Sequence, residues 1–134
     1  VLNDARDEEL IWVMSSYRSA HKDVRALVDQ RWDMAAVLRN AANAGDNRTR
    51  FEYAMYLRDR AKTPDDLSQS TQWLKKAAEG GYDDAMVELG FALGFGLGTQ
   101  SNKSAALDWL ARAENLGHPR AAGLAQMIGA FYGQ

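Results

Sequence analysis

A pattern of eleven residues occurs three times in this chain at a constant spacing, and this periodicity restricts the fold more than any other feature. The copies begin at Val37, Trp73 and Trp109 and align without a gap, so that each begins 36 residues after the one before. Periods of about 20 to 50 residues are typical of solenoids, in which each unit buries its apolar face against its neighbours. The residues that recur in register are Leu38, Leu74 and Leu110, then Ala41, Ala77 and Ala113, and finally Gly45, Gly81 and Gly117.

The residue content predicts that these units are helical. Alanine, leucine, methionine, arginine and glutamate are strong helix formers and dominate the chain, which has only two prolines and no alternating run of β-branched residues. Each copy is expected to end a helix at its glycine, in the left-handed conformation that glycine adopts without a Cβ penalty. Asp4 is expected to cap a first helix whose apolar stripe is Leu10, Ile11, Met14 and Tyr17.

Length, charge and cysteine content restrict the class of protein. A chain of 134 residues suits one domain, and a net charge of -2 argues against nucleic-acid binding. The absence of cysteine excludes a disulfide framework, and no segment reaches the roughly 18 apolar residues of a membrane span. The chain begins at Val1 without a methionine or a signal segment, so we expect either a processed form or a piece of a longer protein.

The segment from Ala85 to Ala121 resembles a Sel1-like repeat, an α/α repeat related to the tetratricopeptide repeat (TPR). That family combines an alanine, a Leu-Gly pair, a glycine-rich turn and a Lys-Ala motif with a tryptophan nearby. The resemblance implies an all-α fold, an α/α superhelical solenoid of helix-turn-helix repeats with a 36-residue period. The matching residues are Ala85, Leu89, Gly90, Gly96, Gly98, Ala106, Trp109, Ala113, Gly117 and Ala121.

The repeats divide a single domain, residues 1–134, into four parts. Residues 1–48 are expected to form a degenerate first unit with an N-terminal cap helix, residues 49–84 the second repeat, residues 85–120 the third repeat and residues 121–134 a C-terminal capping helix. The second repeat matches the family less well, because "RDRAKTPDDLSQS" places a proline-containing acidic loop where the glycine-rich turn should be. The last third of the chain therefore matches the motifs of the family, whereas the start of the chain shares mostly its repeat spacing.

The resemblance also implies a binding surface. In TPR-like stacks the first helix of each pair lines the concave face, and the residues two before and two after the leucine of the Leu-Gly pair point into it. With arginines one helical turn beyond, this surface would suit a peptide or helix with apolar anchors and acidic flanks. The alternative is that the aromatic and methionine side chains of this set pack as core. The predicted partner-binding residues are Arg48, Phe51, Met55, Arg58, Val87, Phe91, Arg120 and Met127.

These inferences favour a protein-protein interaction module: an adaptor, scaffold or regulatory subunit that needs no cofactor or metal and does not insert into a membrane. A specific inhibitor or immunity protein that blocks an enzyme or toxin is the alternative, and a tight one-to-one complex would distinguish it. A hydrolytic enzyme is less expected. The resemblance implies partners in bacterial cell-envelope, secretion or signalling systems, which favours a periplasmic or other extracytoplasmic location. The lack of cysteine argues against the disulfide-rich secreted branch of the family.

Three further signals favour structural roles over chemistry. "GFGLG" at residues 94–98 resembles a phosphate-binding loop, but it joins two helices and is expected to be a tight turn. Acidic pairs such as Asp83-Asp84 precede helices and are expected to cap them rather than to act as a general acid and base. His118 follows a helix end and is expected at the surface, and neither histidine has the spacing of a metal site.

Overall fold

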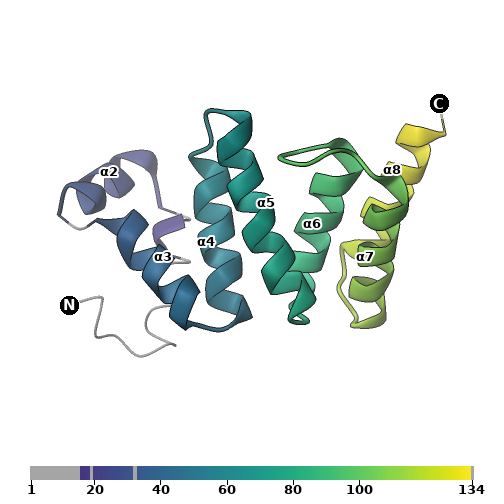
Figure 1. The fold of residues 1–134 in the computed structure, drawn as a ribbon, viewed down its shortest axis with the longest axis horizontal. Coiled ribbons are helices and arrows are strands. Elements are labelled where there is room, and N and C mark those ends of the chain that lie inside the picture. The colour runs from purple at the N-terminus through teal and green to yellow at the C-terminus, as the bar shows by residue number, and fades with distance from the viewer. Residues whose placement is uncertain (1–15, 19, 32, 134) are drawn as a thin grey trace.

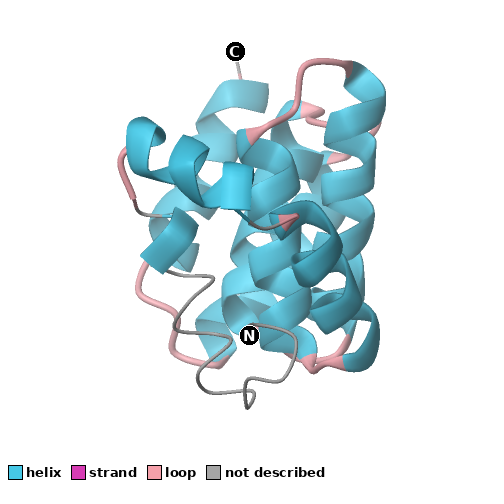
Figure 2. Ribbon diagram, turned by 90° about the vertical axis from the view of Figure 1, so that its left-hand side faces the viewer, coloured by secondary structure: helices cyan, strands magenta, loops and turns pink. Residues whose placement is uncertain are grey.

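The computed structural model describes residues 16–18, 20–31 and 33–133. This part of the chain consists of α-helices and the loops that join them, without a strand among the described residues (Figure 2). The helices follow one another from α2 at one end of the molecule to α8 at the other (Figure 1). They are α2 (Lys22–Arg31), α3 (Met34–Ala44), α4 (Asn47–Asp59), α5 (Pro64–Glu79), α6 (Asp83–Phe95), α7 (Lys103–Asn115) and α8 (Ala121–Tyr132).

Helices α4 to α7 form two successive pairs, α4 with α5 and α6 with α7, standing side by side (Figure 1). From α3 to α8 each helix packs against the next one in sequence, and α6 also contacts α8. Contacts between neighbouring units, rather than across the whole chain, are the arrangement of a solenoid. The structure therefore confirms the predicted all-α solenoid.

The leucines that recur in sequence lie in the core of the stack. Leu38, Leu74 and Leu110 are 1%, 1% and 0% exposed, so the leucine of every copy is buried. Burying one such side chain contributes about 1.5–3 kcal/mol to folding. The glycine of the Leu-Gly pair serves close packing, because a Cβ on Gly90 would lie 2.8 Å from Cγ of Leu110. The periodic small and large residues thus set the spacing between α6 and α7.

The three repeated glycines do not all end their helices in the same way. Gly81 and Gly117 have φ angles of 99° and 87°, the left-handed conformation expected of them. Gly45 instead has φ -97° and ψ -168°, an extended conformation, so the prediction was wrong there. The physical reason for glycine at this position is space, since a Cβ on Gly45 would collide with the hydroxyl of Thr49 and with the carbonyl of Ala41.

The segment "RDRAKTPDDLSQS", residues 58–70, is mostly helix rather than the predicted acidic loop, because α4 continues to Asp59 and α5 begins at Pro64. Proline suits the first turn because it has no backbone N–H, and an N–H there would find no acceptor within the helix. The Thr63 hydroxyl accepts a hydrogen bond from the backbone N–H of Asp66, and the Asp66 carboxylate accepts from the backbone N–H of Thr63. This reciprocal arrangement is a capping box. The other unusual turn, "GFGLG", joins α6 to α7 as expected, with Gly96 and Gly98 at positive φ.

The first unit differs from the repeats that follow it. It contains α2, which lies across the end of the row, and α3, which packs on α4 (Figure 1). The Tyr17 side chain is buried, its ring lies 5.9 Å from that of Tyr56, and its hydroxyl accepts a hydrogen bond from Arg60. The expected cap at Asp4 and the stripe from Leu10 to Met14 lie outside the described residues.

Candidate functional site

A groove crosses three helices on one face of the stack. It has a volume of about 440 Å³ and is bounded by α4, α6 and α8, the first helices of successive units. Val87 forms part of its floor, because this side chain is 1% exposed, whereas Met127 is 60% exposed on the α8 side. The lining residues are Arg58 from α4, Val87, Glu88 and Phe91 from α6, Arg120 just before α8, and Leu124 and Met127 from α8.

Five of the eight predicted partner-binding residues line this groove. They are brought together because positions 36 residues apart face the same way on successive first helices, as with Phe91 and Met127. Arg58, on α4, and Arg120, just before α8, reach the groove from the two sides of α6. The five residues are Arg58, Val87, Phe91, Arg120 and Met127.

The other three predicted residues lie elsewhere. Phe51 and Met55 are 6% and 5% exposed and belong to the core, which corresponds to the alternative interpretation of these side chains. Phe51 is covered by Tyr82, whose ring centroid lies 5.3 Å away, and by the guanidinium of Arg18. Arg48 is exposed at the start of α4 and does not line the groove. The groove is therefore shorter than the predicted surface and lies toward the C-terminal half of the chain.

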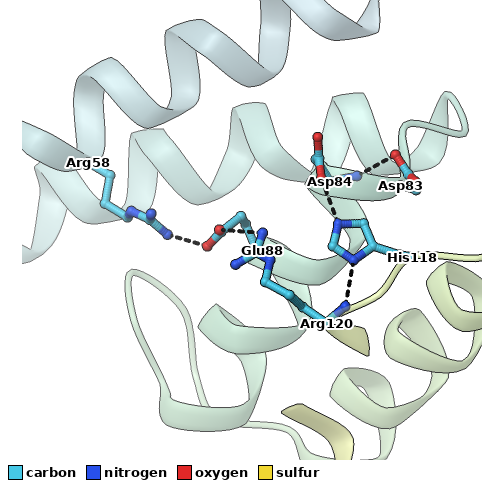
Figure 3. A network of polar contacts seen from close by, with 6 residues as sticks. All are labelled: Arg58, Asp83, Asp84, Glu88, His118 and Arg120. Atoms are coloured by element: carbon cyan, nitrogen blue, oxygen red, sulfur yellow. Dashed lines mark hydrogen bonds and ion pairs between the residues drawn. The ribbon is translucent and has the colours of Figure 1, made fainter. Parts of the chain in front are cut away.

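Glu88 is the groove residue that changes the electrostatics most, and sequence reasoning missed it. Its carboxylate accepts a hydrogen bond from Nη1 of Arg58 at 2.6 Å and lies 3.6 Å from Nη2 of Arg120 (Figure 3). The Glu88 side chain is only 13% exposed. The predicted basic edge is therefore partly neutralised, since two guanidinium groups share one carboxylate.

A sequence signal for Glu88 did exist. Glu52 precedes it by 36 residues and occupies the same position on α4, where its carboxylate lies 3.1 Å from Nε of Arg18. Both glutamates thus pair with an arginine from an earlier part of the chain. Leu124 follows Glu88 by the same interval and replaces the carboxylate with an apolar side chain on α8. Glu52 and Glu88 directly follow the predicted residues Phe51 and Val87, so adding the next residue to each predicted position would have identified them.

His118 is buried beside the groove, in contrast to the surface position expected for it. Its side chain is 5% exposed, and Nε2 lies 2.6 Å from Oδ1 of Asp84 on α6 (Figure 3). The backbone N–H of Arg120 donates to Nδ1 at 3.2 Å. Because Nδ1 accepts this bond, the proton lies on Nε2 and is donated to Asp84. The imidazole therefore connects the start of α8 to α6 and helps to place Arg120.

Tyr82 occupies the equivalent position one unit earlier. It lies 36 residues before His118 and precedes α6 as His118 precedes α8. Burial raises the pKa of the Tyr82 hydroxyl, and the Asp84 carboxylate raises it further. Tyr82 contacts the previous unit through Phe51, whereas His118 does so through Asp84. At these two equivalent positions the side chain thus contacts the preceding unit, with a different chemistry each time.

Among residues 16–18, 20–31 and 33–133, histidine and acidic side chains form no group of three that would hold a metal ion. Within the same residues, no helix has the length and apolar character needed to cross a bilayer.

Comparison with known families agrees with the helical repeats. The model of the Sel1 repeat matches residues 51–82 and residues 83–118, which together make up half of the chain. Comparisons with curated proteins and with solved structures found no match. Sel1 repeats are generally protein-interaction modules and are typically non-catalytic. The match over half of its length, together with the stacked helix pairs, shows that this chain belongs to the Sel1 repeat family.

Proposed function

We propose that this protein is an adaptor, scaffold or regulatory module that binds a segment of another protein in the groove between α4, α6 and α8. The family supports a protein partner in general terms. The choice of the groove rests on its composition, which combines a methionine, an aromatic ring and two arginines in one concavity. These are the side-chain types enriched in protein interfaces.

The observation that carries the proposal is the exposure of Met127 inside a concave surface. This side chain is 60% exposed and lies beside Phe91 and Leu124 in the groove lining. Covering apolar surface contributes about 25 cal/mol for each Å² removed from water, so a partner that fills the groove gains free energy from these contacts. Isolated exposed apolar residues are common on proteins, but several that line one hollow are typical of binding sites.

The test compares two substitutions that each replace an apolar side chain of similar exposure by glutamate. Met127→Glu places a charge inside the groove, and Leu116→Glu places one at a side chain that is 58% exposed at the end of α7, outside the groove lining. Immobilised wild-type and variant proteins are used to capture partners from an extract of the source organism, after circular dichroism shows that each is folded. We expect Met127→Glu to lose a partner that Leu116→Glu retains. Equal capture by both variants would contradict the groove as the binding site.

The mass of the captured complex separates the two kinds of binding module. A scaffold is expected to exchange among several partners with modest affinity, whereas an inhibitor or immunity protein forms one tight one-to-one complex. Light scattering of the purified complex gives its stoichiometry, and dilution gives its dissociation constant. A single partner with a subnanomolar constant would favour the inhibitor over the adaptor.

A further inference from the structure

A row of aromatic rings, partly buried on α6 and exposed on α8, extends the groove toward the C-terminal end of the stack. The Phe91 ring, at the groove, lies 5.0 Å from that of Phe95, which lies 5.2 Å from that of Phe131, and Phe131 lies 5.2 Å from Tyr132. Phe131 is 54% exposed and Tyr132 37%. The Tyr132 hydroxyl donates to the carbonyl of Gly94, which fixes the end of the row against α6. The groove and this row form one continuous apolar strip.

The strip offers a partner few groups to which a peptide backbone can bind. The polar side chains in the groove lining are Arg58, Glu88 and Arg120, and the carboxylate of Glu88 is already shared between the two arginines. No strand edge occurs among the described residues, so a partner cannot add a strand to a sheet there. An extended peptide would leave its backbone groups to water. A helix satisfies these groups internally and presents only side chains.

A helix can also reach the groove with one face. The groove extends from α4 across α6 to α8. A partner helix, with a diameter of about 10–12 Å including its side chains, would lie over the groove and place the side chains of one face in it. Side chains at intervals of three and four residues would then reach Val87, Phe91 and Met127 along one face.

The charge of the lining selects among amphipathic helices. Two arginines and one glutamate leave an excess of one positive charge, and the Arg120 side chain is 61% exposed while its guanidinium lies 3.6 Å from Glu88. An acidic side chain on the partner would therefore have an exposed guanidinium to pair with, whereas a lysine there would be repelled.

From these observations we infer that the groove and the aromatic row receive an amphipathic α-helix of the partner protein that carries an apolar stripe and an acidic residue beside it. The inference rests on the proposed function and adds the class of segment that is bound. Phe131 and Met127 contact the apolar stripe, and Arg120 contacts the acidic residue.

Three synthetic peptides of equal length test this inference against the full chain. The first has leucines at intervals of three and four residues with flanking glutamates, the second has lysines in place of the glutamates, and the third has the first sequence with two central residues replaced by proline. Fluorescence anisotropy gives the three dissociation constants. We expect the acidic helix to bind about tenfold more tightly than either of the others. Equal affinities, a preference for the lysine or proline peptide, or no binding by the acidic helix would overturn the inference.

Variants of the protein locate the peptide and separate this inference from the proposed function. Met127→Glu and Phe131→Glu should each weaken binding of the acidic helix about tenfold. Leu116→Glu should leave the affinity within about twofold, since a residue outside the interface contributes little to binding. Loss of the cellular partner by Met127→Glu, combined with tighter binding of the proline peptide, would mean that the groove binds an extended segment. The helix inference would then fail while the proposed function stands. Partner and peptide binding that are both insensitive to Met127 would contradict both.

Discussion

The carboxylate of Glu88 on α6 accepts a hydrogen bond from the guanidinium of Arg58 on α4 at 2.6 Å, at the centre of the candidate groove. The pair joins two first helices of adjacent units, and both side chains are largely shielded from water, at 13% and 28% exposure. It therefore has two effects, since it stabilises the contact between units and it reduces the positive charge that a partner meets.

Glu88→Gln tests the first effect. Loss of the charged pair should lower the free energy of unfolding by about 1–2 kcal/mol, because the bond is charge-assisted and only partly exposed. Urea denaturation measures this change. Glu114→Gln, at an exposed position on α7, is the control and should change stability by less than about 0.5 kcal/mol. An equal effect of the two substitutions would show that the pair adds nothing to stability.

Gly90 and Gly129 should respond in opposite ways to alanine. A Cβ at Gly90 would lie 2.8 Å from the side chain of Leu110 and 3.3 Å from the carbonyl of Ala106, whereas one at Gly129 meets nothing within 4 Å. Gly90→Ala should destabilise the protein by about 1–3 kcal/mol through overpacking. Gly129→Ala should stabilise it by up to about 1 kcal/mol through helix propensity. Thermal unfolding of both variants checks the prediction, and a stabilising Gly90→Ala would contradict the close approach of α6 and α7.

The tautomer of His118 follows from its two hydrogen bonds. Because the backbone N–H of Arg120 donates to Nδ1 and Asp84 accepts at Nε2, the neutral ring should carry its proton on Nε2. Long-range ¹⁵N–¹H correlation spectra of the imidazole distinguish the two tautomers directly. Asp84→Asn keeps an acceptor for Nε2–H and should preserve this tautomer. A proton on Nδ1 in the wild-type protein would show that the link between α6 and the start of α8 is not formed.

The capping box at the start of α5 should make the free energy of unfolding depend on pH in the acidic range. Hydrogen bonds from the backbone of Lys62, followed by those from Thr63, lower the pKa of the Asp66 carboxyl below its usual value of 3.8, although burial opposes this shift. The stabilisation is therefore fully present above about pH 3.8 and is lost as the pH falls through the lowered pKa.

Two variants check this dependence. Thr63→Ala removes the hydroxyl of the cap and should cost about 1 kcal/mol at neutral pH. Asp66→Asn should flatten the loss of stability below about pH 3.8, and Asp65→Asn, which removes a charge from the same helical turn, should not. Urea denaturation as a function of pH gives both results. An unchanged acid dependence in Asp66→Asn would contradict the capping role.

Much of the fold could be predicted from the sequence because the repeat period fixes which residues are equivalent. The buried leucines follow from the offset of 36 residues, and the same offset relates Met127 to Phe91 in the groove. The turn at residues 94–98 was predicted from its glycines, Val87 and Phe91 from the resemblance to TPR-like stacks, and the arginines from their place one helical turn beyond. The capping box at Thr63 also had a local signal, a threonine followed by proline and then by two aspartates, which was interpreted as a loop. Local chemistry and periodicity are both properties of the sequence alone.

The repeat period could not predict how exposed each of several equivalent side chains is. Met55, Phe91 and Met127 are 36 residues apart, yet Met55 is buried, Phe91 is partly buried and Met127 is 60% exposed. The difference arises from what covers each one, since α4 and α6 have helices on both sides and α8 ends the described row. The pairing of His118 with Asp84 likewise depends on how α8 packs on α6. Such contacts between units are set by tertiary packing rather than by the period.

The most direct test of the groove as the binding site follows the methyl groups of the methionines by NMR while the captured partner is added. Met127 lies in the groove, and Met34 is 2% exposed in the core of the first unit, so it serves as the internal control. The account predicts that the Met127 resonance shifts or broadens in proportion to the complex formed while that of Met34 stays in place. Formation of the complex with the Met127 resonance unchanged would contradict it.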